Sequence, residues 1–411
     1  MARPRLVVVG AGMASGRMLE HLTDAGADFD ITLINAEPRG NYNRLMLSPV
    51  LAGEKTYAEI VTHDDAWYAD RGITTHFGQR VEQIDLAGRT LTGGFGELGY
   101  DKLVIATGSD PFIIPLPGHD LPGVIAYRDL EDTELMMSLA PGSRAVVIGG
   151  GLLGLEAAAG MAARGVKVSV VHIMGHLMER QLDPEAAGLL QASLEARGIE
   201  VHCEANSEAI LGEGGKVSGL RLKDGQVLPC DLLVMAVGIR PAVKLAADAG
   251  LSVDRAIIVD DQMCTSDGHV LALGECVQHR GNLFGLVAPL YDQAAVAADT
   301  LMGQPATFVQ KSLSTKLKVT GCDLFSAGDF SDTDIRENVL FRDPSAAVYR
   351  RLVIENDCLV GAVMYGDTSD SAWYADLIER RQNVSDLRDT LIFGQAYADQ
   401  DPTLSRCSLA A

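Results

Sequence analysis

The sequence predicts an α/β protein with two parallel-sheet domains and a small α+β unit towards its C-terminal end. Two observations support this prediction. Near residue 5 and again near residue 145, a short apolar strand runs into a glycine-rich turn, a helical pattern and a second apolar strand. Each such segment is followed later by another buried strand that ends in glycine, at 103–108 and at 232–238. This order is typical of parallel sheets whose strands are joined by helices.

The segment 145–171 carries the more regular of the two glycine turns. Its first strand leads into Gly149, Gly151 and Gly154, and an Ala-rich helix follows. In this context the first glycine allows the tight turn, the second lets a pyrophosphate approach the backbone, and the third lets the helix pack closely on the strand. The helix N-terminus then offers free N–H groups to an anion. We therefore expect a dinucleotide-binding, Rossmann-like domain here rather than a purely structural turn.

The N-terminal segment repeats this pattern with one departure. Gly10 and Gly12 follow the first strand, but Ser15 stands at the third position, where a small side chain still permits close packing. After the second strand, Glu37 is expected to hydrogen-bond a ribose, and a surface glutamate in a turn is the alternative. Two nucleotide sites in one chain suggest a flavin, FAD, paired with a nicotinamide dinucleotide.

A polar turn and a short helix are predicted at 41–53. Ser48 is the expected N-cap of this helix, with Pro49 as its first residue. Arg44 lies in the turn, where it could pair with a pyrophosphate or remain a solvated arginine. Its position alone does not decide between these two roles.

Further candidate residues follow the buried strands that lie between and after the glycine turns. Thr107 and Gly108 end one such strand, and Gly274 and Glu275 end another. A helix beginning near Pro289 could direct the positive end of its dipole at an electron-rich ring oxygen.

A proline-rich crossing near residue 118 predicts a domain boundary. We expect a discontinuous FAD-binding domain at 1–115 and 242–310, and a NAD(P)H-binding domain at 116–241. A C-terminal α+β domain should occupy 311–394, followed by a polar, flexible tail at 395–411.

Composition excludes several functional classes. The 411 residues carry a formal net charge of −21, which argues against nucleic-acid binding because a basic surface is then expected. No apolar run is long enough to span a membrane, and residues 1–5 leave no room for a signal peptide, so we expect a cytoplasmic protein. The seven cysteines form no CxxC pair, which disfavours a zinc site or a disulfide framework, and no metal is expected.

The motifs GAGMASG, ATGSDP, IGGGLLGLE, AVGIRP and LALGEC, together with the Glu37 turn, resemble two-dinucleotide-binding-domain flavoprotein reductases such as ferredoxin and rubredoxin reductases. A narrower resemblance is carried by YNRLMLSPVLAGE, VVHIMGHLMERQLD, GECVQHRGNLFGLVAPLYDQA and STKLKVTG. These are similar to the N-terminal flavin part of the NADH-dependent assimilatory nitrite reductase large subunit. They equally resemble the flavin electron-transfer subunit of assimilatory nitrate reductase.

The resemblance implies roles for matching residues. Those implied to hold FAD are Gly10, Gly12, Ser15, Glu37, Arg44, Ser48, Thr107, Gly108 and Glu275. Gly274 and Pro289 are further candidate FAD-binding residues. Those implied to hold NADH are Gly149, Gly151, Gly154 and Glu156, with Glu156 near the nicotinamide. His172 replaces the acidic residue usual at the end of the second strand. Neutral, it could hydrogen-bond a ribose hydroxyl; protonated, it could face a 2′-phosphate. The narrow resemblance implies NADH, and NADPH stays open.

These features predict an FAD-dependent NAD(P)H:acceptor oxidoreductase in which the flavin receives the hydride and no side chain acts as a catalytic acid or base. No cysteine stands at the positions that disulfide reductases or NADH peroxidases use, and no iron–sulfur cysteine cluster follows, so nitrite reduction by this chain alone is not expected. The expected partner is an electron-accepting protein: an Fe–S or molybdenum reductase subunit of nitrate or nitrite assimilation. The alternatives are a rubredoxin or ferredoxin, or a redox sensor resembling apoptosis-inducing factor that barely turns over. A homo-oligomer is possible.

Overall fold

A computed structural model describes residues 3–310, 315–319 and 321–398, without the side chains of 315–319. The chain divides into two compact units. Unit 1 comprises 1–112, 128–133 and 238–311, and unit 2 comprises 113–127, 134–237 and 312–411. Helix α5 (Leu130–Met137) begins in unit 1 and ends in unit 2.

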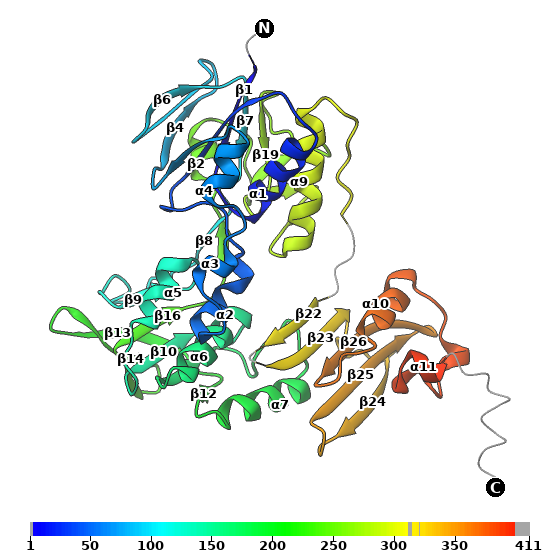
Figure 1. Cartoon of the computed structure of the whole chain (residues 1–411). Helices are drawn as coiled ribbons and strands as arrows, with labels where there is room; N and C mark the ends of the chain where they lie inside the picture. The colour runs from blue at the N-terminus through cyan, green and yellow to red at the C-terminus, as the bar shows by residue number, and fades with distance from the viewer. Residues whose placement is uncertain (1–2, 311–314, 320, 399–411) are drawn as a thin grey trace. The chain divides into compact units, whose positions relative to one another are not determined.

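Unit 1 is built on a five-stranded parallel sheet in the order β19-β7-β1-β2-β3 (Figure 1). These strands are β1 (Arg5–Val9), β2 (Asp30–Asn35), β3 (Thr74–Phe77), β7 (Lys102–Ile105) and β19 (Val270–Ala272). Its helices are α1 (Met13–Asp24), α2 (Leu47–Ala52), α3 (Tyr57–Ile60), α4 (Asp65–Asp70), α8 (Lys244–Asp248) and α9 (Val287–Leu301). Smaller sheets comprise β4 (Val81–Asp85), β5 (Thr90–Gly93) and β6 (Gly96–Gly99); β8 (Ser109–Pro111) and β17 (Ile239–Pro241); and β18 (Ile257–Val259), β20 (Val277–His279) and β21 (Asn282–Leu283).

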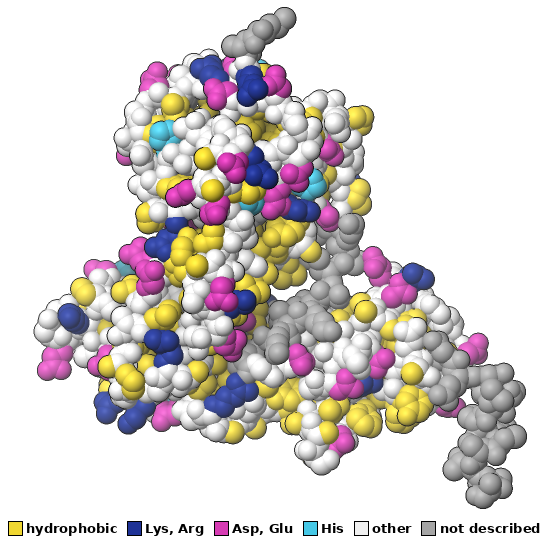
Figure 2. Space-filling model, viewed as in Figure 1, with side chains coloured by type: hydrophobic (Ala, Val, Ile, Leu, Met, Phe, Trp, Pro, Cys, Tyr) yellow, Lys and Arg dark blue, Asp and Glu magenta, His cyan; other side chains and the backbone are white. Residues whose placement is uncertain are grey.

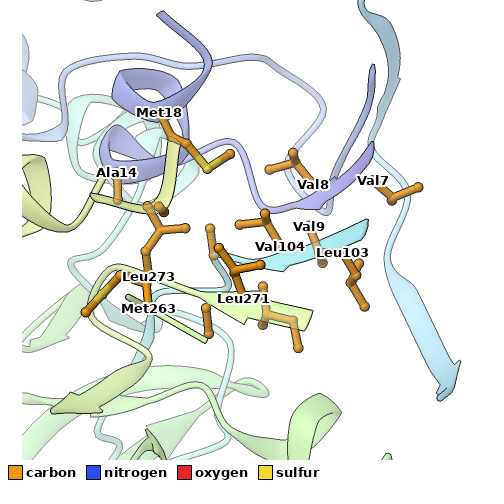
Figure 3. Close-up of a cluster of buried hydrophobic side chains, with 14 of the residues drawn as sticks. Val7, Val8, Val9, Ala14, Met18, Leu103, Val104, Met263, Leu271 and Leu273 are labelled. Carbon is orange, nitrogen blue, oxygen red and sulfur yellow. The ribbon is translucent and has the colours of Figure 1, made fainter. Parts of the chain in front are cut away.

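The core of unit 1 lies between this parallel sheet and helices α1 and α9. Central strands β1 and β7 read as continuous apolar runs because a parallel sheet is covered on both faces. Figure 3 shows Met18 of α1 beside side chains of β1 and β7, and Met18, Val8 and Leu103 are fully buried. This packing fixes the carboxyl ends of the strands, where the glycine turn begins.

Unit 2 repeats the arrangement with a second parallel sheet in the order β12-β11-β10-β16-β9. Its strands are β9 (Val124–Ala126), β10 (Arg144–Ile148), β11 (Lys167–Val171), β12 (Glu200–His202) and β16 (Leu232–Met235), with helices α6 (Leu152–Ala163) and α7 (Pro184–Glu195). An antiparallel sheet of β13 (Ser207–Glu213), β14 (Lys216–Leu222) and β15 (Val227–Pro229) packs beside it. Strand β10, which precedes the glycine turn, pairs with β11 on one side and with β16 on the other. In the same way, β1 of unit 1 pairs with β2 and with β7.

The C-terminal part of unit 2 is an antiparallel sheet in the order β22-β23-β26-β25-β24, with a helix on it. These elements are β22 (Thr315–Val319), β23 (Cys322–Gly328), β24 (Glu337–Asp343), β25 (Val348–Glu355), β26 (Cys358–Tyr365), α10 (Ser371–Arg380) and α11 (Gln395–Ala398). The predicted fold class, two Rossmann-like domains and an α+β C-terminal part, is therefore confirmed. Residues 395–398, at the start of the predicted flexible tail, form the short helix α11, and residues 399–411 lie outside the described residues, so the flexible tail stays a prediction.

The N-cap assignment at 41–53 is wrong. A 3₁₀ turn (Arg44–Met46) precedes α2, and Asn43 accepts a hydrogen bond from the Leu45 N–H, so α2 begins at Leu47. Ser48 consequently lies inside the first turn of the helix.

Acidic side chains are interspersed with basic ones on the face shown in Figure 2. Among the described residues, none of the helices has the length and apolar character required to cross a membrane. The lysines of STKLKVTG lie where side chains are not described.

Candidate functional site

The glycine turn of unit 1 brings the end of β1 close to the strand beside it. Gly10 adopts a positive φ of 104°, and a Cβ placed there would lie 2.3 Å from the carbonyl oxygen of Ala106. Only glycine tolerates this combination. Ser15, fully buried, donates its hydroxyl hydrogen bond to the Gly10 carbonyl at 2.6 Å. The serine at the third position therefore fits against the strand and satisfies its own polar atom.

The corresponding turn of unit 2 has glycine at all three positions of the motif. Gly149 has a φ of 126°, and its Cβ would lie 2.2 Å from the Ala236 carbonyl oxygen. A Cβ on Gly154 would lie 2.0 Å from the Gly149 carbonyl oxygen. Helix α6 thus approaches the strand as closely as a dinucleotide fingerprint requires.

Both turns leave an open cradle at a helix N-terminus. The N-caps of α1 and α6 are Gly12 and Gly151, neither end has a side-chain cap, and the first turns hold no acidic residue. A Cβ on either glycine would meet nothing within 4 Å. Uncapped N–H groups, a positive dipole end and open space above the backbone fit the pyrophosphate of a dinucleotide.

Unit 1 also contains a cavity of about 110 Å³ beside this turn. It is lined by Gly10, Asn35, Ala36, Gln79 and Thr107, among others. The buried Oε1 atom of Gln79 has no hydrogen-bond partner among the described residues. An unsatisfied amide oxygen in a cavity at the end of β2 fits the nucleoside end of FAD, because a nucleobase amino group can donate to it.

Glu37 and Arg44, both expected to contact FAD, lie in contact with each other. The Glu37 carboxylate accepts hydrogen bonds from Arg44 and, at 2.8 Å, from the Tyr42 hydroxyl. Burial raises the pKa of Tyr42, so this hydroxyl stays protonated and donates. Arg44 also donates to the Arg128 carbonyl at 3.1 Å. Arg44 is thus a held side chain and not a solvated turn arginine.

Glu275 is held by two residues that are distant in sequence. Its Oε2 atom accepts hydrogen bonds from Arg128 Nη2 and from Ser109 Oγ, both at 2.6 Å. Its side chain is only 16 % exposed, so a charge-assisted pair of this kind fixes the carboxylate firmly. The adjacent Thr107 hydroxyl donates to the Ala242 carbonyl at 2.9 Å.

Gly274 and helix α9 form the neighbouring part of unit 1. The Gly274 N–H donates to Gln293 Oε1 at 2.8 Å, and the buried Gln293 Nε2 has no partner among the described residues. Helix α9 begins at Val287, two residues before Pro289, and its N-terminus has neither a side-chain cap nor an acidic first turn. An unpaired buried donor and a free helix N-terminus fit a cofactor with acceptor oxygens.

His172 is held on both sides by the protein. It is buried, its Nδ1 accepts a hydrogen bond from the Gly150 N–H at 3.1 Å, and its Nε2 lies 3.0 Å from Glu179 Oε2. Because Nδ1 accepts from a backbone N–H, the ring proton is on Nε2 and is donated to Glu179. With Nδ1 turned to the Gly150 N–H and Nε2 to the Glu179 carboxylate, neither ring nitrogen faces a ligand phosphate. Glu156 lies half-buried on α6, and its contact with a nicotinamide stays a prediction.

Six cysteines fall in the described part of the chain, and all are free thiols. Burial raises the pKa of Cys230 to about 12 and also raises that of the fully buried Cys276. Thiols of this kind are poor nucleophiles at neutral pH. Among the described residues, no three His, Cys, Asp or Glu side chains are grouped to hold a metal ion.

Sequence reasoning missed several residues that the fold brings to these sites: Ser109, Arg128, Gln79, Gln293 and Glu179. Glu179 lies within the HLMERQLD motif, but no pattern in the sequence indicates that it contacts His172. Arg128 lies 147 residues from Glu275, so no local pattern links them.

Two glycine cradles on two parallel sheets define a protein that binds two dinucleotides. The family model for pyridine nucleotide-disulphide oxidoreductases matches residues 4–300, and the chain belongs to this family. It is accordingly an NAD(P)H-dependent oxidoreductase that binds FAD and NADH. A second model, the rubredoxin NAD⁺ reductase C-terminal domain, matches residues 314–382.

Individual relatives show which members of this family the chain is similar to. The chain is 43% identical over 390 residues to a nitrite reductase [NAD(P)H] of Bacillus subtilis (strain 168), covering 94% of this chain and 48% of that protein. It is 40% identical over 396 residues to the assimilatory nitrate reductase electron transfer subunit of the same organism, covering 95% and 51%. The chain thus spans about half the length of these relatives. A ferredoxin reductase for the CYP199A2 system from Rhodopseudomonas palustris superposes with a TM-score of 0.80 at 29% identity, covering 90% and 93%.

Proposed function

We propose that this chain is the NADH-oxidising flavoprotein component of assimilatory nitrate or nitrite reduction, which passes electrons to a protein partner. The observation that carries the proposal is the similarity over 94% and 95% of the chain to a nitrite reductase and to a nitrate reductase electron transfer subunit. The two cradles support it, since they provide one site for each dinucleotide.

Bound FAD would supply the redox chemistry by accepting two electrons as hydride and releasing them to the acceptor. The residues of unit 1 would bind and orient it: the turn at Gly10 and Gly12 at the pyrophosphate, Glu37 at the ribose, and Glu275 near the middle of the cofactor. Arg128 and Ser109 hold the Glu275 carboxylate in place. Pre-organised partners of this kind keep a cofactor in one orientation.

In unit 2, the turn from Gly149 to Gly154 would bind the NADH pyrophosphate, and Glu156 would lie near the nicotinamide. Burial raises the thiol pKa at Cys203, Cys230, Cys264 and Cys276, so none of these four is the activated thiol that a disulfide reductase of this family needs. Electrons are therefore expected to leave for an external acceptor instead of a resident disulfide.

The test is reconstitution with purified acceptors. FAD-loaded protein, NADH, nitrate and a molybdenum-containing nitrate reductase subunit should together produce nitrite by reduction of the nitrate, and omission of any component should abolish production. A rubredoxin or ferredoxin in place of that subunit should be reduced more slowly. Nitrite production no faster than in the mixture lacking this chain would contradict the proposal.

A second candidate is a rubredoxin or ferredoxin reductase. The match of residues 314–382 to the rubredoxin NAD⁺ reductase C-terminal domain and the likeness to a ferredoxin reductase favour it. The same reconstitution separates the two functions, because rapid reduction of rubredoxin without nitrite production would select the second.

A further inference from the structure

The two glycine turns correspond residue by residue through their backbone hydrogen bonds. In unit 1 the Gly10 N–H donates to the Ile34 carbonyl at 2.7 Å. In unit 2 the Gly149 N–H donates to the Val171 carbonyl at 2.9 Å. Ile34 and Val171 are therefore equivalent positions at the ends of β2 and β11, and the residues after them can be compared directly.

The next residue accepts a hydrogen bond from the turn in both units. The Ala11 N–H donates to Asn35 Oδ1 at 3.2 Å, and the Gly150 N–H donates to His172 Nδ1 at 3.1 Å. Asn35 and His172 thus have the same role: each accepts the hydrogen bond of the N–H in the middle of its glycine turn. In His172 this bond occupies Nδ1, so only Nε2 can bind another group.

The units differ in where they supply a carboxylate. In unit 1, Glu37 stands two positions after Asn35. The equivalent residue of unit 2 is Met174, which is 47% exposed and cannot accept a ribose hydrogen bond. A carboxylate nevertheless lies beside the residue that accepts from the turn, because His172 Nε2 donates to Glu179 Oε2 at 3.0 Å.

The loop that carries Glu179 is tied to the glycine turn. The Met178 N–H donates to the Gly150 carbonyl at 2.9 Å, and Met178 is fully buried with a positive φ of 55°. A methionine held in this sparsely populated region shows that its surroundings over-determine the loop. A Cβ on Gly150 would lie 2.6 Å from His172 Cγ and 2.8 Å from Leu177 Cδ2, so this turn is shaped to receive the ring and the loop together.

We propose that Glu179 accepts the hydrogen bond of the adenosine ribose 2′-hydroxyl of NADH and repels the 2′-phosphate of NADPH, with His172 as its positioning residue. The inference rests on the proposed use of a nicotinamide dinucleotide by unit 2. The Glu179 side chain is 28% exposed, so one face remains open to a ligand while the other is held by His172. A carboxylate gains a charge-assisted hydrogen bond from a hydroxyl and meets like-charge repulsion from a phosphate.

Equilibrium binding measurements test the proposed role of Glu179 without depending on catalytic turnover. FAD-loaded protein is titrated calorimetrically with ADP-ribose and with its 2′-phosphate. The wild type should favour ADP-ribose, and Glu179→Gln should reduce that preference about tenfold or more, since a charge-assisted bond and a repulsion are both removed. His172→Asn keeps an acceptor for the Gly150 N–H, as Asn35 does, but cannot reach Glu179 in the same way. It should reduce the preference similarly with an unchanged melting temperature.

Glu195→Gln, on α7 of the same unit, removes an equal charge and serves as the control that should leave the preference unchanged. A preference unaltered in Glu179→Gln would overturn the assignment, and one unaltered in His172→Asn alone would overturn the positioning role. A wild type that binds the 2′-phosphate more tightly also contradicts it. Failure of the proposed function looks different: selective binding of ADP-ribose would persist while no nitrite forms with the acceptor.

Discussion

Replacement of Asp183 by alanine should destabilise unit 2 strongly, because this one carboxylate supports three groups. Asp183 caps α7 by accepting from the Ala186 N–H at 2.9 Å. It also accepts from the Tyr349 hydroxyl at 2.6 Å and from Arg351 Nη1 at 3.2 Å. The residue is 4% exposed, so water cannot replace the lost partner. Asp183 therefore links α7 to β25 of the C-terminal sheet.

The magnitude follows from what each group loses. Loss of an N-cap costs about 1 kcal/mol, and breaking a buried ion pair costs about 3–5 kcal/mol. Arg351 keeps Asp332 at 2.6 Å and Asn338 at 2.9 Å, so the ion-pair cost lies at the low end of its range. We expect Asp183→Ala to lower the free energy of unfolding by about 4 kcal/mol.

Denaturant unfolding of the FAD-loaded protein measures this loss, with a cycle that includes Tyr349→Phe. Burial and the hydrogen bond to Asp183 raise the pKa of Tyr349, so its hydroxyl donates throughout the accessible pH range. The two substitutions should be non-additive by about 1 kcal/mol, since each removes the same bond. Asp376→Ala, which breaks an exposed pair with Arg380 on α10, is the control and should cost less than about 1 kcal/mol. Additive effects, or a loss at Asp183 no larger than at the control, would contradict the role of Asp183 as a shared partner of α7 and β25.

Three further outcomes are expected. Gly149→Ala places a Cβ 2.2 Å from the Ala236 carbonyl oxygen at a φ of 126°. The affinity for NAD⁺ should therefore fall at least about tenfold while the FAD absorbance persists. Tight NAD⁺ binding by this variant would contradict the role of the glycine turn as the NAD⁺ site. Cys230 and Cys276 should resist iodoacetamide at pH 7.5, as mass spectrometry would show, because burial raises both thiol pKa values; rapid labelling of the native protein would disprove this. Burial lowers the pKa of His63 below its usual 6.5. As the pH falls, the unfolded chain therefore binds a proton at this residue before the folded chain does. Stability should therefore fall as pH drops below about 6.5, and thermal melts of His63→Gln should show a shallower fall between pH 7 and 5; identical slopes would remove His63 as the cause.

The fold could be predicted because its signals are local. Each glycine turn, its helix and its two strands lie within about 30 residues, which is the length of one βαβ unit. Ser15 illustrates how well local reasoning works: a small residue was expected to fit, and its hydroxyl bonds to the Gly10 carbonyl. Ser48 shows where it fails, since Asn43 caps a 3₁₀ turn that moves the start of α2 to Leu47.

The partners of the site residues were beyond sequence reasoning for a different reason. The Glu275 carboxylate is bound by Arg128, which is 147 residues away, and this contact depends on how the chain returns to the sheet edge. Similarly, the sequence does not predict the bond between Arg44 and Glu37, and a role of Arg44 at the pyrophosphate stays a prediction. Patterns along a chain identify the turn that faces a ligand, but side-chain bonding among residues near it depends on tertiary packing.

The comparison of the two turns also explains why a motif search at the end of β11 finds no acidic residue. The acid in such a motif hydrogen-bonds the ribose 2′-hydroxyl. In this chain the residue directly after the strand instead accepts from the glycine turn: Asn35 in unit 1 and His172 in unit 2, at 3.2 and 3.1 Å. Once a separate residue accepts from the turn, the carboxylate is free to come from elsewhere, and Glu37 and Glu179 sit two and seven positions further on. With Glu179 in its proposed role, the absence of an acid directly after the strand is no sign of NADPH preference.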